Sequence, residues 1–232
     1  MDGQFIKEVE EILHEKSLLN HPFYKLWTAG KLSVDALRGY AKQYYFLEAE
    51  FPRFLLQTGT HAPTESANAV VMENYAEETA KEKSHVDMWL DFASGLGLEK
   101  NSVKQTQAMQ STVNVLSSFD VSTKTSWLSG MAALLAYEAN LQETSMTKLA
   151  GLQKFYGVTD KQSTQFFEIH GVLDLQHSND WKNLLVQSAS SAEQQSEVKN
   201  VVGSSMEVLW KFLDGIYEKY NCDCMAPTSS AS

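Results

Sequence analysis

The centre of the chain contains the stretch Met131-Ala132-Ala133-Leu134-Leu135-Ala136-Tyr137, which is apolar on every face that a helix would present. A helix that is apolar all round is typical of a buried position, so we expect this segment to be the central helix of the fold. Glu138 follows directly and ends the apolar stretch with a carboxylate. Because an unpaired buried carboxylate is costly, Glu138 needs a partner or a metal ion.

Apolar residues recur at helical spacing on both sides of this segment, over nearly the whole chain. Only four prolines occur, and no strand pattern of period two persists. We therefore predict an all-α bundle of about seven to eight helices in one domain, residues 1–220, followed by a disordered tail at 221–232. Ser33 is an expected N-cap, and Pro52 is an expected kink. The predicted helices are 3–16, 22–29, 33–60, 65–96, 102–117, 124–154, 160–189 and 193–220.

The composition of the 232-residue chain argues against several classes of protein. Hydrophobic residues make up 43% of it, too many for a mainly disordered chain. The net charge of −10, without a Lys/Arg cluster, argues against a nucleic-acid surface. No apolar run approaches the ~20 residues that span a bilayer, and the N-terminus lacks a signal-peptide pattern. The only cysteines, Cys222 and Cys224, lie in the tail, and the sequence assigns them no role. A chain without structural disulfides is typical of the reducing cytoplasm, so we expect the protein there. Secretion into a host stays open.

Two ionisable side chains stand in the apolar stripe of the predicted helix 65–96. Glu78 and His85 are seven residues apart, about two helical turns, so we expect both on one face. A single buried histidine is usually only hydrogen-bonded, and a single glutamate commonly lies at a rim. A metal site is therefore indicated only if further ligands converge on this pair.

The predicted helix 160–189 supplies such ligands at His170, Asp174 and His177. Intervals of four and three residues let the three side chains converge on one side of a helix. Three carboxylates and three imidazoles nearly balance the charge of two divalent ions, and ligation without thiolate suits iron or manganese better than structural zinc. We therefore predict a site for two metal ions. Its ligands are Glu78, His85, Glu138, His170, Asp174 and His177.

The motifs around these residues resemble those of the haem-oxygenase-like dimetal oxidases over roughly residues 5–220. Within that family the chain is most similar to the para-aminobenzoate synthases that include the chlamydial protein associating with death domains. TenA and PqqC proteins share the fold but lack the full ligand set. The resemblance implies two iron ions, or manganese and iron, on the six residues. It rests on His21-Pro22-Phe23-Tyr24-Lys25-Leu26-Trp27, Tyr40-Ala41-Lys42-Gln43-Tyr44-Tyr45, Glu78-x6-His85-x3-Trp89, Tyr137-Glu138, Lys148 before Gly151-Leu152, and the triad at 170–177.

The resemblance also implies a reaction in which the enzyme consumes itself, using dioxygen and an external reductant. Tyr24 would become the aromatic ring of para-aminobenzoate for folate synthesis, and Lys148 would donate the amine. Such chemistry needs a cavity that excludes water. Tyr40, Tyr44 and Tyr137 are further candidates to line it.

Three positions leave details of this prediction open. Lys148 lies ten residues after Glu138 and points away from it by about 80° on a straight helix, so spacing alone favours an exposed lysine. Phe166 stands where the family has a cavity tyrosine, which removes a hydrogen bond or radical relay. Glu48 replaces an apolar residue on the stripe of Tyr44, either as a carboxylate of the site or as a rim charge.

Two other functions stay open. The first is a dimetal oxidase acting on a diffusible small molecule such as an amino acid, a lipid or a PQQ-like precursor. The second is an interaction protein that binds death domains, for which the sequence contains no identifiable feature. We expect dioxygen and a small molecule as partners, and neither nucleic acid nor membrane. A homodimer stays open because related folds often dimerise.

Overall fold

The structure is a computed structural model that describes residues 2–220 and 222, apart from the side chains of residues 2, 142, 143 and 172–177. The described residues form ten α-helices and one 3-10 helix, without a strand, so the predicted all-α class is confirmed. The elements are α1 Asp2–Glu15, η1 Leu18–Asn20, α2 Pro22–Thr28, α3 Val34–Gly59, α4 Glu65–Glu78, α5 His85–Gly95, α6 Lys100–Lys104, α7 Gln110–Thr125, α8 Trp127–Phe155, α9 Lys161–Ser188 and α10 Ala192–Lys219.

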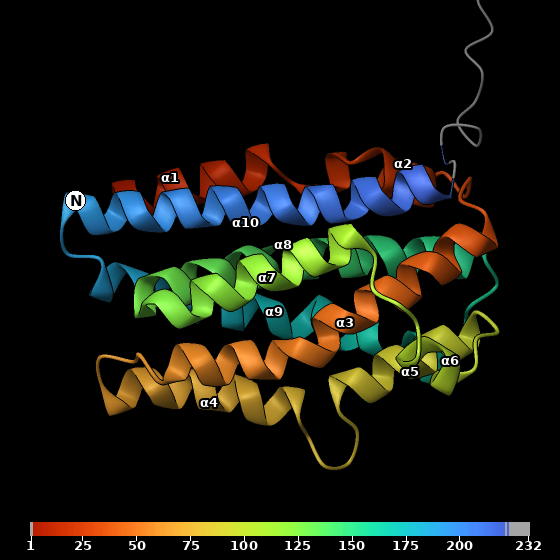
Figure 1. Cartoon of the computed structure of the whole chain (residues 1–232), viewed down its shortest axis with the longest axis horizontal. Helices are drawn as coiled ribbons and strands as arrows, with labels where there is room; N and C mark the ends of the chain where they lie inside the picture. Colours follow the sequence, from red (N-terminus) through yellow and green to blue (C-terminus); the bar gives the residue numbers. More distant parts are fainter. Residues whose placement is uncertain (1, 221, 223–232) are drawn as a thin grey trace, which may run out of the picture.

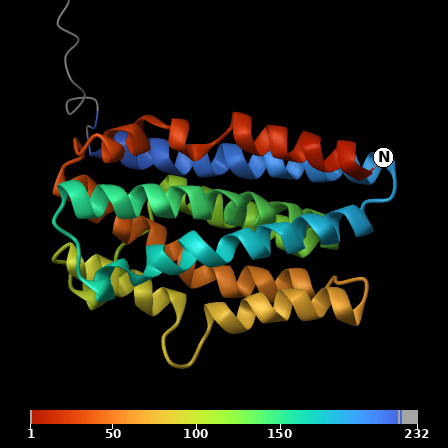
Figure 2. The same cartoon turned by 180° about the vertical axis from the view of Figure 1, so that it is seen from behind.

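Helix α8 is the centre of the bundle. In Figures 1 and 2, α1 and α10 lie along one edge and α3 and α4 along the opposite edge, with α7, α8 and α9 between them. Helix α8 contacts α3, α7, α9 and α10, and each residue of 131–136 is 0% exposed. The prediction that this apolar stretch forms the central helix is confirmed.

Local sequence signals account for several helix ends. Ser33 caps α3 as predicted, because its hydroxyl oxygen accepts a hydrogen bond from the Ala36 amide at 3.1 Å. Pro52 lies inside α3, and the ribbon of this helix changes direction along its length in Figure 1. Gly30 ends the turn after α2 with a φ of 66°, a conformation that glycine adopts without steric cost.

The predicted helix 65–96 is wrong, because the chain forms two helices there, α4 and α5. Ser84 caps the start of α5. Its hydroxyl accepts a hydrogen bond from the Asp87 amide at 3.1 Å and donates one to the Asp87 carboxylate at 2.8 Å. Serine followed three residues later by an acidic residue is a known helix-start signal, so the break could have been predicted. Glu78 therefore ends α4 and His85 begins α5, and the two do not share a helix face.

Two further boundaries differ from the prediction. The predicted helix 102–117 corresponds to parts of α6 and α7, with residues 105–109 between them. Helix α8 begins at Trp127 because the Ser126 hydroxyl accepts a hydrogen bond from the Ser129 amide at 3.0 Å. Serine at a helix start satisfies an amide that has no partner inside the helix.

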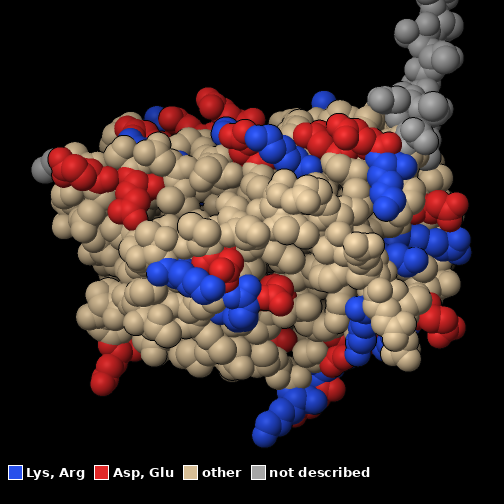
Figure 3. Space-filling model, viewed as in Figure 1, with Lys and Arg blue, Asp and Glu red and all other residues tan. Residues whose placement is uncertain are grey.

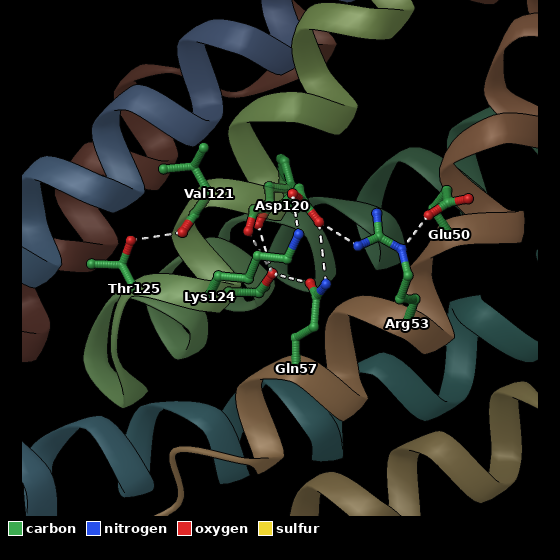
Figure 4. A network of polar contacts seen from close by, with 9 residues as sticks. Glu50, Arg53, Gln57, Asp120, Val121, Lys124 and Thr125 are labelled. Atoms are coloured by element: carbon green, nitrogen blue, oxygen red, sulfur yellow. Dashed lines mark hydrogen bonds and ion pairs between the residues drawn. The ribbon is translucent and has the colours of Figure 1, made fainter.

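Ion pairs on the surface join α3 to α7 (Figure 4). Arg53 of α3 pairs with Asp120 of α7 and with Glu50 one turn earlier. Gln57 donates to Asp120 at 3.2 Å, and Lys124 lies 2.7 Å from its other oxygen. Hydrogen bonds, foremost from Arg53, hold the pKa of Asp120 well below its usual range. These contacts join α7 to α3, the helix that carries Tyr40 and Tyr44.

Charged side chains of both signs are interspersed on the face in Figure 3. None of the helices formed by residues 2–220 combines the length and the apolar character that crossing a membrane requires. Cys222 is 0% exposed, and the disordered tail at 221–232 stays a prediction. The rest of that tail, including Cys224, lies outside the described residues.

Candidate metal centre and tyrosine cavity

Three of the six predicted metal ligands come together where α4, α5 and α9 meet. Glu78, His85 and His170 each offer an atom within 4.8 Å of the other two, and all three are buried. The Nδ1 atom of His85 lies 2.9 Å from Oε1 of Glu78. The ring centroids of His85 and His170 are 4.5 Å apart. The break between α4 and α5 thus brings Glu78 and His85 together, although the predicted geometry was different.

The hydrogen bonding of His170 and Glu78 fits a metal ion. Nδ1 of His170 donates to the carbonyl oxygen of Phe166 at 2.7 Å, because a carbonyl can only accept. The lone pair of the ring is therefore on Nε2, and a backbone bond of this kind commonly orients a ligating histidine. The Oε2 atom of Glu78 is buried without a hydrogen-bond partner among the described residues, which is costly unless a cation compensates.

Glu138 adds another buried carboxyl near this group. It is 2% exposed, and its pKa is raised well above the ordinary value by burial first, then by the charges of Glu78 and Glu48. Several buried carboxyls in one place are destabilising unless positive charge is supplied. Metal ions would supply it. The side chains of Asp174 and His177 lie outside the described part of the chain, so their role stays a prediction.

The predicted cavity tyrosines are buried and form two hydrogen-bonded pairs. The hydroxyl oxygens of Tyr24 and Tyr40 are 3.1 Å apart, and the Tyr44 hydroxyl donates to that of Tyr137 at 2.8 Å. The ring centroids of Tyr40 and Tyr44 lie 5.3 Å apart and connect the pairs. Burial raises the pKa of Tyr24, and raises that of Tyr40 and Tyr137 well above 10.0, so the three phenols are neutral at physiological pH.

Lys148 is buried among these tyrosines, and the expectation of an exposed lysine is wrong. The side chain is 1% exposed. Its Nζ atom lies 5.5, 5.4 and 5.0 Å from the ring centroids of Tyr24, Tyr40 and Tyr44, within cation–π range. Counting residues along a straight helix misses this position, because long side chains lean toward the N-terminus of their helix. Lys148 therefore reaches back along α8.

Helix α2, which carries Tyr24, makes a close contact with α8 beside the buried tyrosines. Trp27 donates a hydrogen bond from Nε1 to the carbonyl oxygen of Lys148 at 3.2 Å. A Cβ atom on Gly151 would lie only 2.6 Å from the Trp27 ring, so the contact requires glycine. Trp27 and Gly151 both belong to the motifs that carry the family resemblance. Their contact could not be predicted from the sequence, because it joins segments far apart in the chain.

The first turn of α2 is fixed by His21. Its Nδ1 atom accepts a hydrogen bond from the Phe23 amide at 3.0 Å, so Nε2 carries the proton and donates to Asp214 at 3.0 Å. Histidine before proline at the first helical position could have suggested this start. Together, His21 and the α2–α8 contact determine where Tyr24 lies.

Two residues left open by the sequence are buried beside the site. Glu48 is 2% exposed and accepts a hydrogen bond from the Tyr137 hydroxyl at 2.6 Å, so the alternative of a rim charge is wrong. Burial first, then the charge of Glu78, raises the pKa of Glu48 to about 8. Phe166 packs its ring 4.0 Å, between centroids, from that of His170. At this position, where the resemblance implied a tyrosine hydroxyl, the chain makes a packing contact.

The chain matches the family of iron-containing redox enzymes with the haem-oxygenase-like fold over residues 38–208. The chain belongs to this family. A 4-aminobenzoate synthase of Nitrosomonas europaea is 33% identical to this redox enzyme over 98% of the chain and 97% of the relative. Another, from Chlamydia muridarum, is 26% identical and covers 94% and 92%. A haem-oxygenase-like domain of unknown function from Shewanella denitrificans superposes with a TM-score of 0.80 at 17% identity, covering 99% and 97%. The predicted fold family and enzyme class, an oxidoreductase, are confirmed.

Proposed function

We propose that this redox enzyme makes 4-aminobenzoate from its own Tyr24, with Lys148 as the nitrogen donor and dioxygen as the oxidant. The observation that carries the proposal is the burial of the Lys148 amine 5.5 Å from the centroid of the Tyr24 ring. A surface lysine contributes to solubility, whereas the buried amine of Lys148 lies against the Tyr24 ring, where the two groups can react. Two relatives, from Nitrosomonas europaea and Chlamydia muridarum, are named 4-aminobenzoate synthase, which supports the same product.

The atoms of the product can all be supplied by these groups. The ring and Cβ of Tyr24 provide the carbon skeleton, and the bond between Cβ and Cα breaks. A hydrogen takes the place of Cβ on Cα, and Cβ is oxidised to the carboxylate. The nitrogen of Lys148 replaces the phenolic oxygen, which leaves as water. The bond between Nζ and Cε of Lys148 breaks, and Cε is oxidised to an aldehyde. Dioxygen is reduced to water, and an external reductant supplies the electrons that Tyr24 and Lys148 do not. The protein loses a side chain, so each chain reacts once.

The metal site of the proposal consists of two iron ions, or manganese and iron. Bound iron supplies one-electron chemistry toward dioxygen. The candidate ligands are Glu78, His85, Glu138, His170, Asp174 and His177.

The residues of the chain contribute burial, orientation and proton placement. Tyr24 is 2% exposed, so bulk water is excluded from its ring. Tyr40 shares a hydrogen bond with the Tyr24 hydroxyl and restrains the phenol in one orientation. Tyr44 forms another wall of the space around the Lys148 amine.

The test is product formation by iron-loaded, reduced protein exposed to oxygen, with the product separated and weighed by mass spectrometry. Tyr24→Phe and Lys148→Met variants are expected to make none, with iron content unchanged. Tyr45→Phe is the matched control, because Tyr45 lies on α3 but is only half-buried. If Tyr24→Phe protein still makes 4-aminobenzoate, the self-sacrificing reaction is wrong. Several turnovers per chain would favour an oxidase of a diffusible substrate.

Homodimerisation and binding to death domains stay predictions from the family resemblance, and cytoplasmic localisation stays a prediction from the placement of the cysteines. Light scattering of the purified protein tests the first. Pull-down with death domains, with and without bound metal, tests the second, and fractionation of cells tests the third.

A further inference from the structure

Glu48 contacts the tyrosine cluster through Tyr137 and lies near the candidate metal ligand Glu78, and the proposed reaction assigns it no role. Its side chain is 2% exposed, and it projects from α3 toward α8. The charges of Glu78 and Lys148 both act on Glu48, the first raising its pKa and the second lowering it. A carboxyl in such a position is stable only when partners compensate for the lost water.

Two hydrogen bonds run in one direction and end on Glu48. Tyr44 donates to the hydroxyl of Tyr137 at 2.8 Å, and Tyr137 donates to Oε1 of Glu48 at 2.6 Å. Oε1 accepts this bond, as an ionised carboxylate oxygen or as the carbonyl oxygen of a protonated carboxyl, so it determines where the hydroxyl proton of Tyr137 points. The remaining lone pairs of that hydroxyl then face Tyr44.

The chain of hydrogen bonds begins at Tyr44, whose ring is closer to the lysine amine than the rings of Tyr24 and Tyr40. The Nζ atom of Lys148 lies 5.0 Å from the centroid of Tyr44, compared with 5.4 Å for Tyr40 and 5.5 Å for Tyr24. Rotation or displacement of Tyr44 would therefore change the space in which the amine rests. Reactivity between bound groups falls steeply with small displacements.

We propose that Glu48 is a positioning residue whose Oε1 atom orients Tyr137 and, through it, Tyr44, and so holds the Lys148 amine beside Tyr24. Its catalytic consequence rests on the proposed function, whereas its effect on the two phenols does not.

The geometry favours this role over direct metal binding. The group of ligand atoms within 4.8 Å of one another comprises Glu78, His85 and His170, among the residues described. Glu48 and the predicted ligand Glu138 both lie outside that group, so the group alone does not decide the role of Glu48. The deciding contact is the hydrogen bond from Tyr137 to the Oε1 atom of Glu48. A ligand role would instead require Glu48 to give up or share this bond.

The test compares Glu48→Leu, which removes the acceptor, with Glu48→Gln, whose side-chain oxygen can still accept. Glu50→Leu is the matched control on the same helix, because the Glu50 side chain is 38% exposed. The first readout is the set of NMR resonances of ring-labelled tyrosines in the zinc-loaded full chain, assigned with single Tyr→Phe variants. Zinc is diamagnetic and does not support redox turnover, so Tyr24 stays intact.

Glu48→Leu is expected to shift the resonances of Tyr137 and Tyr44, and Glu48→Gln to leave them close to wild type. Unmoved resonances in Glu48→Leu would refute the proposal, as would loss of bound iron in Glu48→Gln, which would identify a ligand. In the iron-loaded enzyme, product yield should fall about 10-fold to 100-fold in Glu48→Leu and recover in Glu48→Gln. If wild type makes no 4-aminobenzoate, the proposed function fails, and the NMR comparison still decides the role of Glu48.

Discussion

Gly151→Ala tests whether the contact between α2 and α8 positions Tyr24. The added Cβ would lie 2.6 Å from Cδ1 and 2.8 Å from Nε1 of Trp27, a ring that is fully buried and cannot rotate away. Helix α2 must therefore shift, and Tyr24 with it. The matched control is Gly203→Ala inside α10, where a Cβ would have no neighbour nearer than 3.8 Å.

The expected magnitude follows from comparing the two substitutions. Alanine inside a helix gains about 1 kcal/mol over glycine at both sites. Overpacking costs about 1–3 kcal/mol at Gly151 only. At about 3 °C per kcal/mol for a domain of this size, Gly151→Ala should melt about 3–9 °C below Gly203→Ala.

Calorimetry measures the melting difference, and the yield of 4-aminobenzoate per chain measures its functional consequence. The yield should fall at least about tenfold in Gly151→Ala and stay at the wild-type level in Gly203→Ala, since a displaced Tyr24 reacts poorly. Equal melting temperatures and equal yields would refute the reasoning that this glycine sets the position of α2.

Two further predictions concern pH and metal binding. Burial, the largest cause, lowers the pKa of His21 from 6.5. The unfolded chain then protonates first as pH falls, so the free energy of unfolding should decrease below about pH 6.5 until the folded-state pKa is passed. Urea unfolding of wild type and His21→Asn compares the slopes, and equal slopes would contradict the assignment. His170→Ala should weaken iron binding by more than about 100-fold, which exceeds the loss expected for a residue that only orients a ligand. Elemental analysis measures the iron content, with circular dichroism as a folding control. Full iron content in the variant would exclude His170 as a ligand.

The features predicted well from the sequence are those that depend on local pattern. An all-round apolar stretch at 131–137 identifies a central helix, because burial is the only stable position for it. Ser33 is recognisable as an N-cap because capping involves residues only three apart. The grouping of Glu78 with His85 was predicted from the wrong geometry, since apolar periodicity continues across the break that Ser84 introduces.

The features that could not be predicted depend on packing between distant segments. The burial of Lys148 requires α2 to cover α8, and the sequence does not state which helices adjoin. The hydrogen bond of Tyr137 to Glu48 joins α8 to α3 in the same way. The sequence could identify Lys148 and Glu48 as candidate site residues. Only the three-dimensional contacts show that each is buried beside the tyrosines and is not a surface charge.

The central claim is that Tyr24 is consumed in a reaction that depends on iron and oxygen. The most direct measurement is the intact mass of the iron-loaded, reduced protein before and after exposure to oxygen, with peptide mapping of the product. We predict a loss of mass in the peptide that contains Tyr24 and a smaller change in the peptide that contains Lys148, which gives up its nitrogen. The amount of 4-aminobenzoate released should match both changes, and metal-free protein should show neither. Release of 4-aminobenzoate from protein of unchanged mass would contradict the account.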